Sequence, residues 1–340
     1  KKLAADHPDT LATLHNLAKA YLHAGRLPEA IELSEHVREV CVRTLGADHP
    51  HTLTTLNNLA GAYQAVGRLP EAIKLFEYVR DEQAKKLGAD HPKTLATLNN
   101  LATAYWSTTR LDKSVPLFED LLKRMQALLG RNHPSTQQCV ANLGVNYKDS
   151  GRLEEAVPLL EEAYHASHQI QTLHWVGAQL LDAYVKAGKT TDAAGLVQEL
   201  LAEARTTVPQ ASPQLAGVLA QAGLTLLRVK AWTEAEGVLR ECLATREKIQ
   251  PDTWTTFNTK SMLGEALLGQ EKYAEAEALL LAGYEGMKEH EAAIPPEGKI
   301  RLTEALRRLA DFYAATGQAE KADEWRKKLE KTRATEEKPN

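Results

Sequence analysis

Apolar side chains recur at helical spacing along almost the whole sequence. One such set falls on a single face of a 3.6-residue period and consists of Leu53, Leu56, Leu59, Ala60 and Tyr63. A second apolar stripe follows after Gly67 and consists of Leu69, Ala72, Ile73, Phe76 and Val79. Pro50 suits the first turn of a helix, and Gly67 suits the residue just after its end. The pattern predicts two helices joined by a short Gly-Arg turn, which is an antiparallel helical hairpin.

This hairpin pattern repeats every 42 residues in the first half of the chain. The string Leu-Gly-Ala-Asp-His-Pro at 45–50 returns at 87–92, and weaker copies stand at 3–8 and 129–134. After residue 168 the spacing changes, but Tyr184, Gly188 and Ala193 keep the intervals of the earlier repeats. Further hairpins are predicted with their turns near Lys230, Glu271 and Gly317. Strand-like alternation is absent, so the sequence predicts an all-α, right-handed superhelical solenoid of about eight hairpins.

The quality of the repeats predicts the domain organisation. Residues 1–168 form four regular 42-residue repeats, 169–335 form four degenerate repeats that continue the same solenoid, and 336–340 form a disordered tail. The join at 165–173 lacks the Leu-Gly-x-Asp-His-Pro linker, and a bend or a weak interface is expected there. The first three residues match the end of a second helix, so another repeat or a linker is expected upstream.

The matched positions carry a family resemblance. Leu56-x2-Leu59-Ala60-x2-Tyr63, followed by Ala72-x3-Phe76, resembles the tetratricopeptide pattern of small and large residues. The 42-residue length, Leu-Gly-x-Asp-His-Pro and Leu-Asn-Asn-Leu-Ala resemble the kinesin light chain type of repeat. Three positions depart from the pattern: Thr109 replaces the turn glycine, and Met262 and Arg308 replace the repeated asparagine. The resemblance implies a scaffold that binds proteins or peptides on its concave groove.

Composition narrows the choice of partners. The net charge is −4 and no basic surface is evident, so neither nucleic acid nor an anionic membrane is expected as a partner. No apolar run approaches the ~18 residues of a membrane-spanning helix. Cys41, Cys139 and Cys242 are too scattered for a disulfide framework, so buried free thiols and a cytoplasmic location are expected. The isolated segment is expected to be a monomer.

One asparagine position recurs in each early repeat, on the side of the first helix away from its core face. Its members are Asn16, Asn58, Asn100 and Asn142. In the families that the chain resembles, the matching asparagine lines the concave groove and contacts the backbone of a bound peptide. An amide suits this role because it offers a donor and an acceptor together. The alternative is that these asparagines bridge neighbouring helices or face water.

Three further residues are predicted to contribute to peptide binding. Asn57 and Asn99 precede two of the repeated asparagines, and Trp106 follows the tyrosine of the third repeat. An exposed tryptophan at the centre of a groove is a typical binding hot spot. Burial of Trp106 against the next hairpin is the other interpretation.

Catalytic and metal-binding sites are not predicted. The sequence has no phosphate-binding glycine loop and no GxSxG, HExxH or kinase signature. One His-Pro histidine stands in each early repeat, at His7, His49, His91 and His133. Stacked helices lie about 8–10 Å apart, whereas zinc ligands lie about 2 Å from the ion, so these histidines are assigned to loop packing and helix entry. No cofactor is expected.

The sequence therefore favours a non-enzymatic scaffold that binds a protein or peptide. One alternative is a regulatory or sensor C-terminal segment of a larger catalytic protein, such as a Ser/Thr kinase or a nucleotide-switch ATPase. A self-associating structural spacer is a third possibility.

Overall fold

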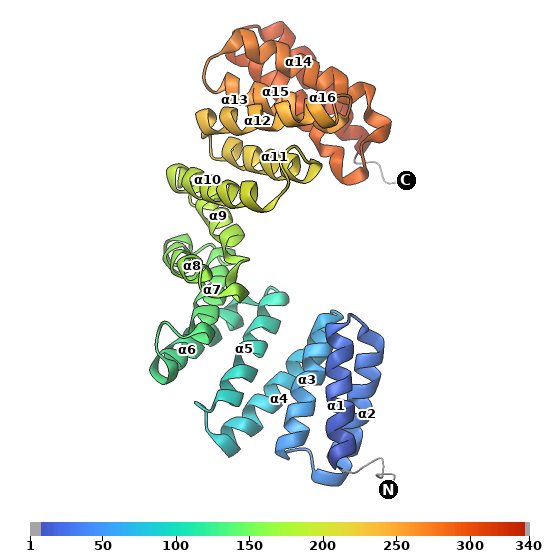
Figure 1. Cartoon of the computed structure of the whole chain (residues 1–340), viewed down its shortest axis with the longest axis vertical. Coiled ribbons are helices and arrows are strands. Elements are labelled where there is room, and N and C mark those ends of the chain that lie inside the picture. The colour runs from blue at the N-terminus through green and yellow to red at the C-terminus, as the bar shows by residue number, and fades with distance from the viewer. Residues whose placement is uncertain (1–7, 337–340) are drawn as a thin grey trace. The chain divides into compact units, whose positions relative to one another are not determined.

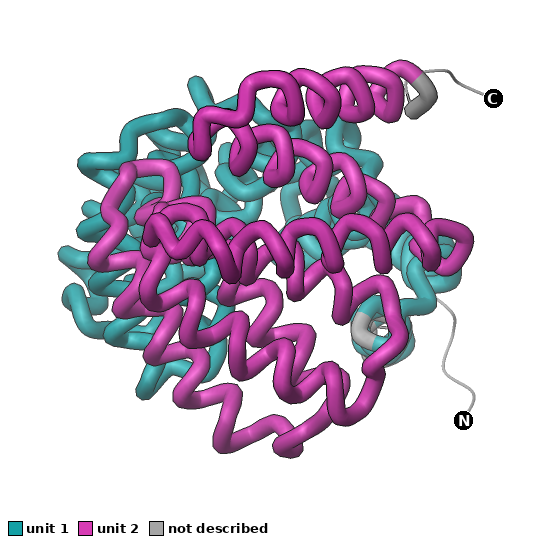
Figure 2. Tube along the Cα trace, turned by 90° about the horizontal axis from the view of Figure 1, so that it is seen from above, with its two compact units in different colours: residues 1–180 teal, residues 181–340 magenta. Residues whose placement is uncertain are grey.

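The structure is a computed structural model, and it describes residues 8–336. Within this range sixteen α-helices follow one another in pairs, and no residue lies in a strand (Figure 1). The all-α class and the eight hairpins predicted from the sequence are confirmed. Two compact units divide the chain, Lys1–Leu180 and Leu181–Asn340 (Figure 2).

The first unit contains the four regular hairpins. They are α1 (Pro8–His23) with α2 (Leu27–Leu45), α3 (Pro50–Ala65) with α4 (Leu69–Leu87), α5 (Pro92–Ser107) with α6 (Leu111–Leu129), and α7 (Pro134–Asp149) with α8 (Leu153–Ser167). A 3-10 turn, η1 (Gln171–Leu173), and the start of α9 (Val176–Lys186) follow. The second helices α2, α4 and α6 each pack on the next first helix, and α1, α3, α5 and α7 contact one another in sequence. The first helices thereby form one continuous surface within this unit.

The second unit contains the degenerate hairpins after the rest of α9. Its helices are α10 (Thr190–Thr207), α11 (Pro213–Arg228), α12 (Trp232–Ile249), α13 (Trp254–Leu268), α14 (Tyr273–Glu289), α15 (Ile300–Ala315) and α16 (Ala319–Glu336). The 3-10 turns η2 (Glu291–Ala293) and η3 (Pro296–Gly298) connect α14 to α15. Neighbouring helices pack from α10 to α16, and α13 contacts both α11 and α15.

The predicted apolar stripes form the core. All five residues of the first stripe are buried, and in the second stripe Ala72, Ile73, Phe76 and Val79 are buried while Leu69 is half-buried. Ala60 and Ala72 are completely inaccessible to solvent, as expected for small residues where two helices approach closely. The helical phase derived from the sequence is therefore correct.

Every hairpin turn has the same backbone geometry. In the second hairpin the Arg68 N–H donates to the Tyr63 carbonyl (2.8 Å), and the Gly67 N–H donates to the Gln64 carbonyl (3.1 Å). This pair of bonds is a Schellman motif, which requires positive φ at the residue between the helices. Glycine occupies that position in five turns, and Thr109, Lys230 and Glu271 occupy it in the others with φ of 57°, 60° and 61°.

The Leu-Gly-x-Asp-His-Pro linker ends one hairpin and begins the next. Gly46 has φ of 95°, and the Thr52 hydroxyl donates to the Gly46 carbonyl (2.8 Å). His49 is the N-cap of α3, and its Nδ1 accepts a hydrogen bond from the His51 N–H (3.2 Å). His91 and His133 cap α5 and α7 in the same way. The predicted role in helix entry is confirmed for these three histidines, and His7 lies outside the described residues.

Tyrosines join successive hairpins of the first unit. The Tyr63 hydroxyl donates to Glu35 of the preceding hairpin (2.5 Å), and Tyr147 donates to Glu119 (2.7 Å). Tyr105 donates to Glu77 in the same way. Tyr63 and Tyr105 are buried and Tyr147 is half-buried. Because each hydroxyl has a partner, these rings can lie in the interface without an unsatisfied polar group.

Some predictions concern residues at the chain ends. The upstream helix expected at 1–3 lies outside the described residues, as does the tail at 336–340 except for Glu336, the last residue of α16. The domain boundary at residue 168 stays a prediction. None of the helices that the structure describes has the length and apolar composition needed to span a membrane.

Candidate functional site

The repeated asparagines lie on successive first helices of the first unit. Asn16 is on α1 and exposed, whereas Asn58, Asn100 and Asn142 are half-buried on α3, α5 and α7. Their placement follows from the 42-residue repeat, which returns the same helix position to the same surface. The predicted row of amides is therefore present on this surface, and its function is a separate question.

Three of the predicted residues make contacts between neighbouring first helices. The Asn142 amide donates to the Asn99 side-chain carbonyl (3.3 Å), and the Thr97 hydroxyl lies 3.2 Å from the Asn57 side-chain carbonyl. Asn142 also accepts a hydrogen bond from Gln138 (3.3 Å). These contacts correspond to the bridging role that the sequence left open for the asparagines. A bound peptide would compete with, or add to, bonds that already exist.

Trp106 is held in place by the next hairpin but is not fully covered by it. Its indole N–H donates to the Asp149 carboxylate of α7 (2.8 Å), and its ring is half-buried. Trp106 therefore packs against the next hairpin and keeps accessible surface, and its role as a binding hot spot stays a prediction. The hydrogen bond fixes the orientation of the ring before any ligand arrives.

Trp106 and Asn142 meet at a cavity of about 250 Å³ between α5, α6, α7 and α9. We call this cavity the Trp pocket, and its lining residues are Thr103, Trp106, Phe118, Asn142, Val145, Asn146, Trp175 and Gln179. None of these side chains is ionisable, so the pocket is neutral, with aromatic rings and amides together. Such a lining suits an apolar or aromatic side chain that has a polar backbone beside it.

Hydrogen bonds keep the amides of the Trp pocket in fixed orientations. Asn146 accepts a bond from the Ser114 hydroxyl (2.6 Å) and donates to the Asn142 main-chain carbonyl (2.8 Å). Gln179 accepts a bond from the Lys148 ammonium (2.6 Å), and that lysine side chain is only 6% exposed. The polar groups are therefore positioned by the protein, which reduces the entropy cost of binding a ligand.

Sequence reasoning missed Trp175 and Gln179. Both lie beyond the regular repeats, where the interval between turn glycines, Gly151 to Gly188, shortens to 37 residues. A signal in the regular repeats could have indicated the pocket. The position one turn after the repeated asparagine is occupied by Thr103 and Val145, and side chains of this size leave room between the helices.

The cysteines and histidines do not form a site in the described residues. Each of the three cysteines is a buried free thiol, as predicted. Burial raises the pKa of Cys139 to about 12, which disfavours the reactive thiolate at neutral pH. Residues 8–336 contain no cluster of three or more His, Cys, Asp or Glu side chains with the geometry for a metal ion.

A family comparison identifies the repeats. The tetratricopeptide repeat model matches three overlapping segments, residues 9–81, 54–127 and 94–166. Residues 9–166 are tetratricopeptide repeats. They cover the four regular hairpins, and repeats of this family generally act as protein-interaction scaffolds without catalytic activity. No curated protein matches the sequence significantly.

Solved structures show a similar fold. Putative kinesin light chain tetratricopeptide-like repeats from Podosopora anserina are 28% identical and cover 72% of this chain and 98% of that chain, with a TM-score of 0.44. Apo RapI is 10% identical and covers 94% of this chain and 98% of that chain, with a TM-score of 0.60. A signal transduction ATPase with a tetratricopeptide repeat sensor, from Pyrococcus horikoshii, is 13% identical with a TM-score of 0.60. The match to this ATPase covers 86% of the present chain and 44% of the ATPase chain.

Proposed function

We propose that this protein is a peptide-binding scaffold that holds a partner segment along the first helices of its first unit. The Trp pocket carries this proposal, because it joins two predicted binding residues, Trp106 and Asn142, to a second tryptophan. Pockets that enclose a whole small molecule are about 300–1,000 Å³ in volume. At about 250 Å³ the Trp pocket fits one large side chain better than a complete ligand.

In this proposal the ligand has two kinds of contact. One apolar side chain inserts between Trp106 and Trp175, while the ligand backbone meets the amides along the first helices. Asn16, Asn58 and Asn100 are the proposed backbone contacts, and Asn57 and Asn99 support them. A buried aromatic anchor with polar contacts around it is the usual pattern of a tight peptide site.

The proposal can be tested with a random dodecapeptide phage library selected on the immobilised protein. The affinity of a selected peptide is then measured by calorimetry with wild type and variants. We expect Trp106→Ala to weaken binding by about 2 kcal/mol or more. Asn58→Ala combined with Asn100→Ala should cost about 1–3 kcal/mol.

Two control variants are matched to these changes. Leu128→Ala removes an exposed apolar side chain from α6, and Asn132→Ala removes an exposed amide from a linker. Both should bind like wild type. Equal affinities of the Trp106→Ala and Leu128→Ala proteins would contradict the proposal, provided that circular dichroism shows unchanged helix content.

A second candidate is a sensor segment of a larger catalytic protein. This candidate is favoured by the fold shared with a signal transduction ATPase that has a tetratricopeptide repeat sensor. The match covers 44% of that ATPase, so the ATPase chain is more than twice as long as its matched region. The two functions are compatible, since a sensor segment also binds a ligand. A nucleotide-binding or kinase domain in the full-length reading frame would establish it. We also propose that the segment is a monomer, which light scattering would test. A cytoplasmic location is a further part of the proposed function.

A further inference from the structure

A second cavity, of about 450 Å³, lies among α11, α12, α13 and α15 of the second unit. Its apolar lining comes from Leu224, Leu227, Leu268 and the indole of Trp232. This volume lies within the range of about 300–1,000 Å³ that is typical of sites for small ligands. We call it the arginine cavity because charged groups occupy the rest of its lining.

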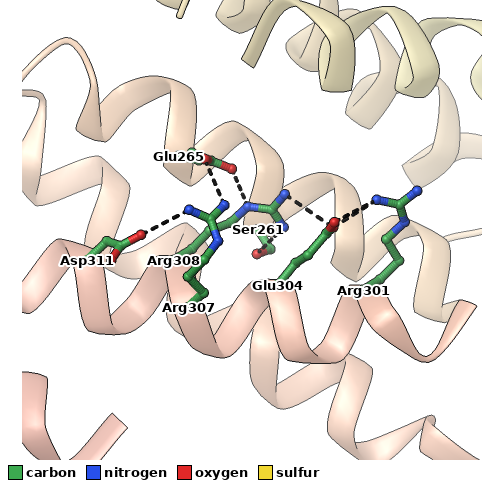
Figure 3. A network of polar contacts seen from close by, with 7 residues as sticks. All are labelled: Ser261, Glu265, Arg301, Glu304, Arg307, Arg308 and Asp311. Atoms are coloured by element: carbon green, nitrogen blue, oxygen red, sulfur yellow. Dashed lines mark hydrogen bonds and ion pairs between the residues drawn. The ribbon is translucent and has the colours of Figure 1, made fainter. Parts of the chain in front are cut away.

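Three carboxylates of the arginine cavity are already paired with three arginines, Arg307 and Arg308 of the lining and Arg301 just outside it (Figure 3). Glu265 accepts bonds from Arg307 (3.2 Å) and from Arg308, whose side chain is only 2% exposed. Arg307 also pairs with Asp311 (3.1 Å), and Arg308 lies 3.7 Å from Glu304. This network satisfies the buried Arg308 charge, which would otherwise be strongly destabilising.

Two other cations of the arginine cavity lack such partners. Arg228 ends α11 and Lys230 lies in the turn after it, and both are exposed. Neither forms an ion pair with any residue in the described part of the chain. The three carboxylates of the lining are thus occupied by arginines, whereas Arg228 and Lys230 have no ion-pair partner among residues 8–336. An anionic group on a ligand would give these two cations a partner.

A glycine shapes the apolar side of the arginine cavity. A Cβ atom at Gly269 would lie 2.3 Å from Cδ2 of Trp232, so the indole ring rests directly on the glycine backbone. The backbone of Gly269 is in the ordinary right-handed helical region, with φ of −62°, so its conformation does not require glycine. The close approach of the indole does require it. Replacing this glycine would push Trp232 out of its present position.

We propose that the arginine cavity binds a ligand in which one carboxylate is attached to an apolar group. The carboxylate pairs with Arg228 and Lys230, and the apolar group packs on Trp232 and the three leucines. An arginine guanidinium binds a carboxylate with two parallel hydrogen bonds, and a neighbouring lysine adds a point charge. This chemistry occurs in free small acids and at the C-terminal residue of a peptide. The site is independent of the Trp pocket.

The indole N–H signals of the five tryptophans provide the readout. The ¹⁵N-labelled full chain is titrated with 4-phenylbutyrate and, separately, with its neutral amide 4-phenylbutyramide. A second pair of probes, acetyl-Gly-Gly-Phe with a free or an amidated C-terminus, tests the peptide source. The Trp232 signal is assigned with Trp232→Phe. We expect saturable shifts of this signal with the acid of at least one pair, and no saturation with either amide.

Three variants separate the contributions. Arg228→Gln combined with Lys230→Gln should weaken binding of the acid by about tenfold or more, which corresponds to about 1.4 kcal/mol. Gly269→Ala should weaken binding without changing any charge, because the displaced indole enters the cavity. Lys299→Gln is the matched control, since it removes an exposed cation of the same unit outside this cavity, and it should bind like wild type.

Several results would overturn the proposal. An amide that binds as tightly as its acid would show that the carboxylate is not recognised. Phenyl phosphate binding more tightly than both acids would show that the cavity does not select a carboxylate. Wild-type affinity in the Arg228→Gln, Lys230→Gln protein would show that these two cations do not contribute to binding the acid. An unmoved Trp232 signal at millimolar concentrations of both acids would show that the cavity is not such a site.

Discussion

At the scale of single residues, the positive φ of the hairpin turns favours glycine at one position. The left-handed turn position of the Schellman motif is occupied by Gly67 in the second hairpin and by Thr109 in the third. A β-branched residue is strained at positive φ because its Cβ crowds the carbonyl that follows. The third hairpin therefore forms the same turn as the second at a higher conformational cost.

We expect Thr109→Gly to stabilise the protein by about 0.5–1 kcal/mol, because relief of left-handed strain exceeds the entropy cost of glycine. The reciprocal change, Gly67→Ala, should destabilise it by about 1 kcal/mol. Beyond the adjoining residues, no atom would lie within 4 Å of a Cβ at Gly67, so this variant isolates the backbone effect. Urea denaturation measures both changes. Destabilisation by Thr109→Gly would show that the Thr109 side chain contributes more than its strain costs.

At the scale of helices and hairpins, the tyrosine–glutamate bonds connect neighbouring repeats. Burial, together with the hydrogen bond to Glu77, raises the pKa of Tyr105 to about 12. The pKa of Tyr147 is raised to about 12 by burial and by its bond to Glu119. An unfolded tyrosine has a pKa of about 10. Between these two values the unfolded chain loses the phenolic proton while the folded chain keeps it.

Stability should therefore fall as pH rises from about 10 to about 12, because the unfolded state binds fewer protons in this range. The contribution of these tyrosines is complete below pH about 10. We expect the Tyr105→Phe, Tyr147→Phe protein to lose less stability than wild type between about pH 9 and about pH 11.5. Urea denaturation at the two pH values gives this difference. Equal losses in the two proteins would mean that the tyrosines do not cause the alkaline destabilisation.

The elements themselves were largely predictable from the sequence. Helical spacing and the 42-residue repeat predicted the regular hairpins, and turns near Lys230, Glu271 and Gly317 were placed correctly in the degenerate half. This worked because each turn repeats one backbone geometry, even where glycine is replaced. Side-chain pairing was less predictable. The bonds from Tyr63 to Glu35 and from Asn142 to Asn99 depend on how successive hairpins pack, which a single repeat does not specify.

The sequence predicted the part of the candidate site that lies in the regular repeats. Trp106 and Asn142 belong to regular repeats, so their shared surface followed from the helical phase. Trp175 and Gln179 complete the Trp pocket from α9 and the residue before it, where the repeat interval changes. The arginine cavity was not predicted at all. Its lining includes Arg308, which occupies the asparagine position of the early repeats, is buried and pairs with Glu265.

At the scale of the whole molecule, the two units carry different surfaces. The first unit presents a neutral row of amides and the Trp pocket, and the second contains the arginine cavity with its paired charges. Stability in such arrays is approximately a sum over repeats and their neighbours, so each unit can keep its own binding chemistry. We propose that the first unit, from α1 to the start of α9, binds the peptide, and that the second unit binds a different ligand.

Hydrogen exchange with mass spectrometry, with and without a phage-selected dodecapeptide, tests the central claim most directly. Our account predicts slower amide exchange on binding in α5 (Pro92–Ser107), in α7 (Pro134–Asp149) and around Trp175. The Trp106→Ala protein should lose this protection at the same peptide concentration. Protection confined to the second helices α4 and α6, or to α11–α16 of the second unit, would contradict a peptide site on the first helices.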